Sequence, residues 1–264
     1  MKQKMSSEFI FQLFALLIAI IVVHAVYVGV IRPSANAQLE AQAQLQAQGQ
    51  EVTERSLVVV IRDLEQEACF ILLIWALAIM GYKGRRTLHE RAILERALLD
   101  IPEGTSVLPE DAREYSRSLE ALREEEQDYL LPRTLLSALQ RFATTGSIQA
   151  VSDTIKEHCD VESDRLDSEM SMVRYIAWAI PSIGFIGTVR GIGDALGQAY
   201  KAVEGDISGV TASLGVAFNS TFVALVLSII IMFCLHQLQL SQERLVLDSQ
   251  RYADRRLLRF LVAH

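Results

Sequence analysis

The sequence predicts an all-α membrane protein, with four transmembrane helices and long helices that extend into the cytoplasm. The 264 residues are 51% hydrophobic and 22% charged, with a mean hydropathy of +0.25. This composition is too apolar for a typical soluble domain and too charged for membrane spans alone. Apolar runs long enough to cross a bilayer also alternate with charged segments of helical spacing, which is typical of a mixed membrane and aqueous architecture.

Composition and motifs exclude several function classes. The net charge of −7 and the pI near 5.3 give no electrostatic support for a nucleic-acid partner. The three cysteines, Cys69, Cys159 and Cys234, are odd in number and have no CxxC spacing, so neither a disulfide framework nor a zinc site is predicted. P-loop, GxSxG, HExxH and EF-hand patterns are absent from the sequence, and its histidines are dispersed. We therefore expect neither an enzyme nor a resident cofactor.

The first predicted element is an N-terminal transmembrane anchor over residues 1–31. Its apolar run, Phe9 to Ile31, contains no charged residue, and its length of about 23 residues, or roughly 34 Å, covers a hydrocarbon core. A cleaved signal peptide is the alternative, but such apolar regions usually span only about 7 to 15 residues, which favours an uncleaved anchor. His24 is interpreted as an interfacial residue rather than a proton relay.

Residues 32–67 are predicted to form a periplasmic segment, and residues 68–82 the second transmembrane helix. The stretch from Ala35 to Gln50 is mostly Ala and Gln, which favours a solvated helix or a spacer because it has little to bury. The apolar run of the second span is short, and Leu57 to Ile61 extend its apolar character upstream.

Residues 83–172 are predicted to form a cytoplasmic helical domain, since basic residues crowd the exit of the second span and positive charge favours the cytoplasmic side. The acidic run from Glu124 to Asp128 is interpreted mainly as a solvated helix face.

Residues 173–240 are predicted to form a transmembrane hairpin, and residues 241–264 a cytoplasmic C-terminal helix. An even number of spans places both termini in the cytoplasm, in a multi-pass membrane protein.

The third span is rich in glycine. Gly184, Gly187 and Gly191 are spaced three and four residues apart, so one helix face lacks side chains and a neighbouring helix can approach closely. Pro181 removes one backbone hydrogen bond and can introduce a kink. These four residues are predicted to govern helix packing.

Two polar clusters lie at similar depth in the last two spans. Thr188 shares the small face of the third span, and Asn219, Ser220 and Thr221 lie together in the fourth. Hydrogen bonds between helices are the commoner role of such residues, but two clusters on adjacent spans favour a polar pathway. Neither cluster contains a carboxylate, so an ion path here needs an acid from elsewhere.

Arg190 and Asp194 are the charged residues of the third span. Their four-residue spacing places the two side chains together on a helix, which favours an ion pair, while a gating role stays open. At about 100° per residue, Arg190 lies some 160° from Thr188 and points away from the predicted pathway.

The pattern Pro181-x-x-Gly-Phe-x-Gly-Thr-Val-x-Gly191, followed by Ala217-Phe-Asn-Ser-Thr-Phe-Val-Ala-Leu225, resembles the MotA/TolQ/ExbB proton-channel family. The resemblance implies a ring of five subunits whose channel-forming hairpins surround single spans from two copies of a MotB/TolR/ExbD-like partner, each with one membrane aspartate. It also implies that Thr188 matches the family's pore threonine and Thr221 the hydroxyl of the following span, with Ser220 or Asn219 sharing that role. Arg190 departs from the family pattern, where a large apolar residue is frequent.

The resemblance implies a stator-like subunit of the bacterial inner membrane that converts proton or sodium flow into rotary work on a cytoplasmic or envelope load protein. Flagellar rotation, outer-membrane energisation, gliding and phage defence are all open as the driven process. The alternative hypothesis is a non-conducting membrane scaffold that recruits a partner through its acidic cytoplasmic helices.

Overall fold

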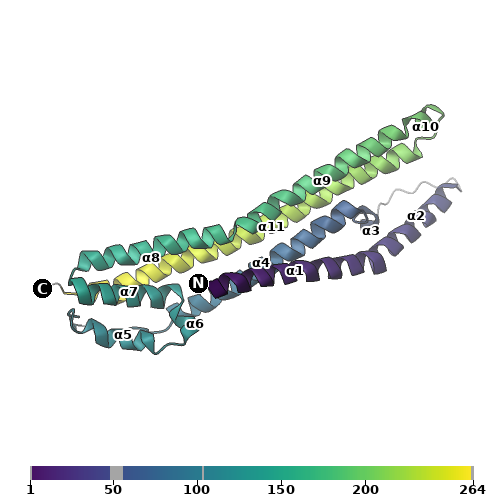
Figure 1. Ribbon diagram of the computed structural model, residues 1–264. Coiled ribbons are helices and arrows are strands. Elements are labelled where there is room, and N and C mark those ends of the chain that lie inside the picture. The colour runs from purple at the N-terminus through teal and green to yellow at the C-terminus, as the bar shows by residue number, and fades with distance from the viewer. Residues whose placement is uncertain (1, 48–55, 103, 263–264) are drawn as a thin grey trace. The chain divides into compact units, whose positions relative to one another are not determined.

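The structure is a computed structural model that describes residues 2–47, 56–102 and 104–262, and these residues are nearly all helical (Figure 1). The elements are α1 (Lys2–Val26), the π-helical η1 (Tyr27–Ile31), α2 (Arg32–Ala47), α3 (Leu57–Val60), α4 (Leu64–Leu94), α5 (Ala112–Glu120), α6 (Glu124–Gln127), α7 (Leu130–Thr145), α8 (Ile148–Glu169), α9 (Ser171–Gly197), α10 (Ala199–Val203), α11 (Ser208–Arg256) and the 3-10 helix η2 (Leu258–Phe260).

The predicted all-α class with four candidate membrane-spanning helices is confirmed. Within the described residues, four helical stretches are long and apolar enough to cross a bilayer: Glu8–Gln42, Leu64–Leu94, Ile148–Gly197 and Ser208–Phe260. The chain is therefore a multi-pass membrane protein. It divides into two compact units, which we call the membrane unit (Met1–Met80 and Met172–Leu235) and the polar unit (Gly81–Ser171 and His236–His264).

The first helix of the membrane unit continues past the predicted end of the first span. The amide of Arg32 donates to the carbonyl of Tyr27, five residues back, which defines the π-helical turn η1. This wider turn ends two residues before Pro33, whose ring nitrogen has no hydrogen to donate to the preceding turn. The chain then continues as α2 to Ala47, so the Ala/Gln-rich stretch is helical up to that residue, and its last three residues, 48–50, lie outside the described ranges.

The second span is one helix that is longer than its apolar run. Helix α4 begins at Leu64, and Glu65 and Glu67 occupy its first turn, where a negative charge is favourable against the helix macrodipole. Trp75 of α4 donates its indole N–H to the carbonyl of Gln12 at 2.9 Å, which ties α4 to α1. The polar residues that precede the apolar run therefore belong to the transmembrane helix itself.

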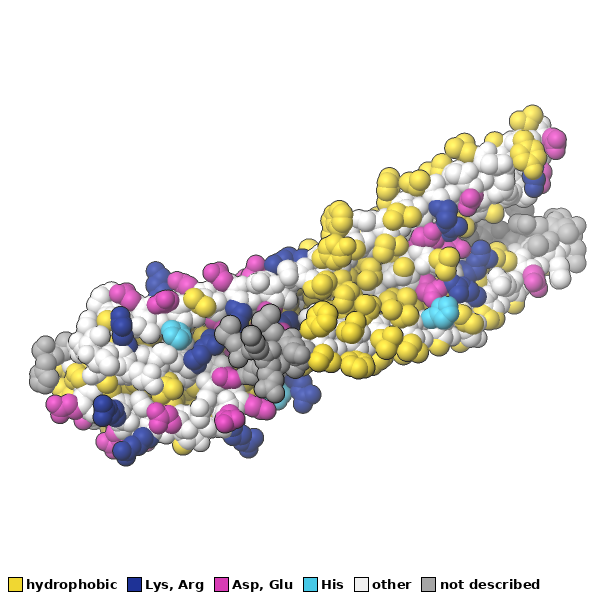
Figure 2. Space-filling model, viewed as in Figure 1, with side chains coloured by type: hydrophobic (Ala, Val, Ile, Leu, Met, Phe, Trp, Pro, Cys, Tyr) yellow, Lys and Arg dark blue, Asp and Glu magenta, His cyan; other side chains and the backbone are white. Residues whose placement is uncertain are grey.

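The membrane unit leaves much of its apolar surface uncovered. Phe185 of α9 and Phe218 and Ile229 of α11 are 65%, 65% and 70% exposed. Figure 2 shows hydrophobic side chains gathering in a broad area on the visible face. Such a surface is unfavourable in water and is typical of a face that lipid or another protein chain covers.

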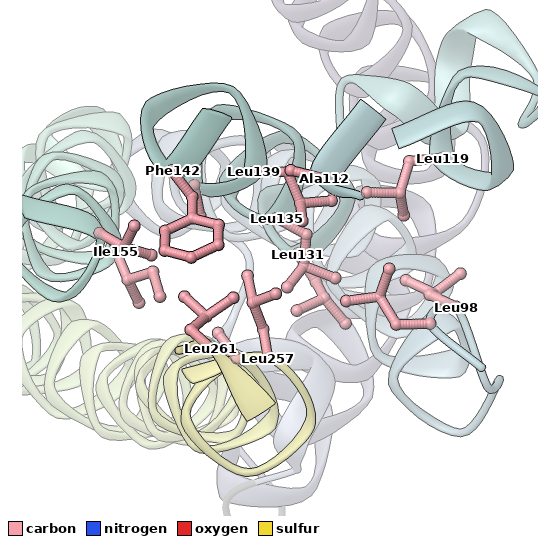
Figure 3. Packing of buried hydrophobic residues seen from close by; sticks show 14 of the residues in the cluster. Leu98, Ala112, Leu119, Leu131, Leu135, Leu139, Phe142, Ile155, Leu257 and Leu261 are labelled. Atoms are coloured by element: carbon pink, nitrogen blue, oxygen red, sulfur yellow. The ribbon is translucent and has the colours of Figure 1, made fainter. Parts of the chain in front are cut away.

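The polar unit has its own hydrophobic core. Side chains from α5, α7, α8 and the C-terminal segment converge there, including the fully buried Leu139, Phe142, Ile155 and Leu257 (Figure 3). Gly146 ends α7 with a φ of +60°, a left-handed conformation that glycine adopts without strain. These helices therefore pack as a unit that does not depend on lipid for its core.

Candidate ion pathway

Helices α9 and α11 lie side by side (Figure 1), and the three predicted glycines lie where the two helices touch. A Cβ atom placed on Gly191 would lie 2.8 Å from the backbone nitrogen of Ala217, and one on Gly187 would lie 2.5 Å from the Cβ of Ser220. At Gly184 the equivalent atom would overlap the Cβ of Ala224. These distances are too short for real side chains, so the glycines permit the close approach of the two helices.

Pro181 lies inside α9, and the helix continues through it. A proline cannot donate to the carbonyl four residues earlier, which here belongs to Ala177. The hydroxyl of Ser228 on α11 donates to that carbonyl at 3.2 Å. The backbone acceptor that the proline leaves without its helical partner is therefore satisfied by the neighbouring helix.

Thr188 of α9 and Thr221 of α11 are in direct hydroxyl-to-hydroxyl contact, and both are half-buried. The Thr188 hydroxyl also lies 3.0 Å from the carbonyl oxygen of Ala217, and the Thr221 hydroxyl lies 3.1 Å from that of Gly184. Each hydroxyl can donate one hydrogen and accept others, so the pair has alternative donor arrangements. We call these two residues the hydroxyl pair.

The other two predicted polar residues point elsewhere. Ser220 is buried, donates to the carbonyl of Val216 at 2.9 Å, and accepts from the side-chain amide of Gln66 on α4 at 3.4 Å. Asn219 is half-buried and makes no side-chain hydrogen bond with the described residues. The structure therefore brings Thr188 and Thr221 together, whereas Ser220 joins α11 to α4.

Arg190 has a partner that its local spacing did not reveal. Its Nε and Nη2 atoms donate to the two carboxylate oxygens of Glu65 at 2.7 and 2.8 Å. The predicted partner, Asp194, is farther away, with 3.8 Å between Arg190 Nη1 and Asp194 Oδ2. A bidentate arginine–carboxylate pair is the stronger geometry, so the main ion pair joins α9 to α4 rather than two turns of α9.

A second carboxylate near the start of α4, that of the buried Glu67, joins α4 to the first helix. Glu67 accepts from Arg32 Nη2 at 2.5 Å, and its other oxygen lies 2.7 Å from His24 Nδ1. Neither Glu65 nor Glu67 was identified as a site residue from the sequence. The signal in the sequence is a pair of acidic residues immediately before the apolar run of the second span. The predicted span begins only at residue 68, so both positions fall outside it.

Beside these pairs the membrane unit contains a cavity of about 360 Å³. Its walls include Arg32, Arg62, Asp63 and Arg190. Burial raises the pKa of the Asp63 carboxyl above its usual value, and Arg62 and Arg190 act in the opposite direction. The cavity is thus a charged recess next to the ion pairs of Arg32 and Arg190.

The arrangement supplies hydroxyl groups but no free acid at the contact between α9 and α11. The hydroxyl pair can relay hydrogen bonds, yet a threonine hydroxyl does not titrate near neutral pH. Glu65 and Glu67 are both engaged by cations. A pathway along this face therefore needs an acid that α9 and α11 do not provide here.

Comparison with known proteins adds one finding. A family model described as the MotA/TolQ/ExbB proton channel family matches residues 126–251. The match includes the glycine face, Pro181, the hydroxyl pair and the helices α7 and α8 of the polar unit. It confirms the family resemblance of the last two spans and extends it upstream into the polar unit. No curated protein matches the chain.

Proposed function

The chain belongs, through residues 126–251, to the MotA/TolQ/ExbB proton channel family, and we propose that it is the channel-forming subunit of an ion-driven motor. In this proposal, proton or sodium flow across the bacterial inner membrane is converted into rotary work on a cytoplasmic or envelope load protein. The subunit carries the ion and catalyses no chemical reaction.

The proposed assembly is a ring of five copies around two copies of a single-span partner. The exposed apolar faces of α9 and α11 support this arrangement, since they need either lipid or other chains to cover them. The partner's membrane aspartate supplies the acid that the hydroxyl pair lacks. Both chain termini lie in the cytoplasm in this arrangement.

The contact between Thr188 and Thr221 carries the proposal. It places two hydroxyl groups from different helices together in a predominantly apolar hairpin, beside a face that glycine keeps free of side chains. A titrating carboxylate that passes this point can exchange hydrogen bonds with both groups. The hydroxyl pair would then act as the site at which the ion is transferred to and from the partner's acid.

The test uses Thr188→Val and Thr221→Val, which keep the side-chain shape and remove the hydroxyl. Thr211→Val is the matched control, because the side chain of the exposed Thr211 bonds only to the carbonyl of Ile207, the residue just before its own helix. Each variant is purified together with a single-span protein of the proposed partner class, which carries one membrane aspartate, and is reconstituted into vesicles for ion-flux measurements. We expect each hydroxyl-pair variant to lower flux by at least about tenfold, and Thr211→Val to conduct normally.

Native mass measurement of the same samples separates lost conduction from lost assembly. Five copies with two partners are expected for every variant. Normal flux in both Thr188→Val and Thr221→Val would overturn the pathway assignment. If function also survived these changes but failed after charge reversal at the exposed Glu124 and Glu125, the scaffold hypothesis would replace the motor.

A further inference from the structure

A second cavity, away from the ion pathway, lies in the polar unit between the end of α4 and the last turns of α11. Its volume is about 600 Å³, within the range of ordinary small-molecule sites. Five arginines contribute to its walls: Arg91, Arg96, Arg251, Arg255 and Arg256. We call it the arginine cavity.

The charge of the arginine cavity is opposite to that of the chain. Glu95 and Asp248 are the acidic residues among its walls, so the lining has three more positive than negative charges, whereas the whole chain has a net charge of −7. Like charges gathered on one surface raise the local positive potential, which attracts an anion.

Most of this positive charge is not neutralised by acidic groups of the described residues. Arg96 pairs with Glu126 at 3.0 Å, and Arg251 lies 3.4 Å from Asp248. Arg91, Arg255 and Arg256 form no ion pair with the described residues. A basic residue in the last turn of a helix is favourable against the macrodipole, but that effect does not explain why five arginines face one cavity.

The walls of the arginine cavity are fixed by Tyr252. Its hydroxyl accepts from the amide of Leu98 at 3.0 Å and lies 3.4 Å from the carbonyl oxygen of Arg96, so it holds the chain after α4 against α11. The half-buried ring of Tyr252, with Leu94 and Ala97, adds apolar surface to the same walls. Cationic and apolar surfaces therefore meet in a preformed space.

We propose that the arginine cavity binds a nucleotide with two or more phosphoryl groups. Arginine forks bind phosphate oxygens in pairs, and an excess of three positive charges suits a polyphosphate. The aromatic and aliphatic wall suits a base, which can stack on a tyrosine ring. Arg91, the first residue of the cavity wall, lies nine residues after Tyr82, the last residue of the predicted second span. Nine residues correspond to about 14 Å along a helix. That separation favours a soluble anion over a lipid headgroup.

The experiment measures binding of ATP and GTP to the purified full-length chain in detergent. The main variant is Arg255→Gln/Arg256→Gln, and the matched control is Arg141→Gln, an exposed arginine of α7 outside the arginine cavity. We expect saturable binding of at least one nucleotide, weakened at least about tenfold in the double variant. The control should bind normally, and affinity should fall as salt is raised.

Helix content and native mass establish that each variant is folded, and Arg91→Gln replaces the double variant if that one fails to fold. The proposal is overturned if neither nucleotide binds the unmodified chain below about 1 mM, a free energy of about 4 kcal/mol, or if the arginine changes leave affinity unaltered. Pyrophosphate that binds as tightly as the nucleotide would overturn the role of the base. Arginine-dependent binding of phosphatidylglycerol vesicles, without nucleotide binding, would identify a headgroup site instead.

Discussion

Arg190 of α9 binds both carboxylate oxygens of Glu65 in α4, although the two residues lie 125 positions apart in the sequence. The two ends of this pair differ in environment: the Glu65 side chain is 11% exposed and that of Arg190 is 45% exposed. Asp194 offers Arg190 a second, more distant carboxylate. The carboxylate of Glu65 therefore depends on the pair more than the guanidinium does.

The first prediction concerns this asymmetry. Arg190→Gln leaves a buried carboxylate without its cation, which costs on the order of 1–3 kcal/mol. Glu65→Gln leaves a half-exposed arginine that can still approach Asp194, so its effect should be smaller. The double variant should be more stable than Arg190→Gln alone. Thermal unfolding of the detergent-solubilised protein measures all three, and equal damage from single and double changes would contradict the assigned pair.

The second prediction concerns the close contact between α9 and α11. Gly191→Ala places a methyl group against the backbone of Ala217 and should separate the two helices. Gly193→Ala is the control in the same helix, since a Cβ there has nothing within 4 Å. Replacing glycine by alanine in an open helical position favours the helix by about 0.5–1 kcal/mol. Thermal unfolding should thus show destabilisation for Gly191→Ala and none for Gly193→Ala.

The glycine contact could be predicted from the sequence because it depends on local periodicity. Residues three and four apart share a helix face, so the spacing of Gly184, Gly187 and Gly191 is sufficient to place them together. Thr188 follows Gly184 by four residues and lies on the same face for the same reason. The family pattern of the hairpin and the four apolar spans are also local features of the chain.

The contacts that bring α4 into the site could not be predicted in this way. Glu65 with Arg190 and Gln66 with Ser220 are pairs of residues separated by more than a hundred positions. Their formation depends on how α4 packs against α9 and α11, which no single run of residues encodes. The first residue of α4 could not be predicted either, because its first turn is polar and the hydropathy of the chain rises only after Glu67.

The third prediction follows from the serine that compensates for Pro181. Ser228→Ala removes the donor to the Ala177 carbonyl and should cost about 1 kcal/mol. In a Pro181→Ala background the helix can supply its own N–H to that carbonyl, so the same serine change should cost less. A double-mutant cycle followed by thermal unfolding measures the difference. Equal costs in the two backgrounds would show that the serine does not serve the carbonyl freed by the proline.

The fourth prediction tests the core of the polar unit. Leu139 of α7 is fully buried, whereas Leu247 of α11 is 50% exposed. Leu139→Ala removes packed methyl groups and leaves a cavity, which typically costs about 2–5 kcal/mol. Leu247→Ala makes the same chemical change at the surface and should cost less than about 1 kcal/mol. Hydrogen exchange of α7 and α8 amides provides the measurement, since it reports local opening directly. Faster exchange is expected for Leu139→Ala only, and comparable exchange in both variants would show that the core does not hold these helices together.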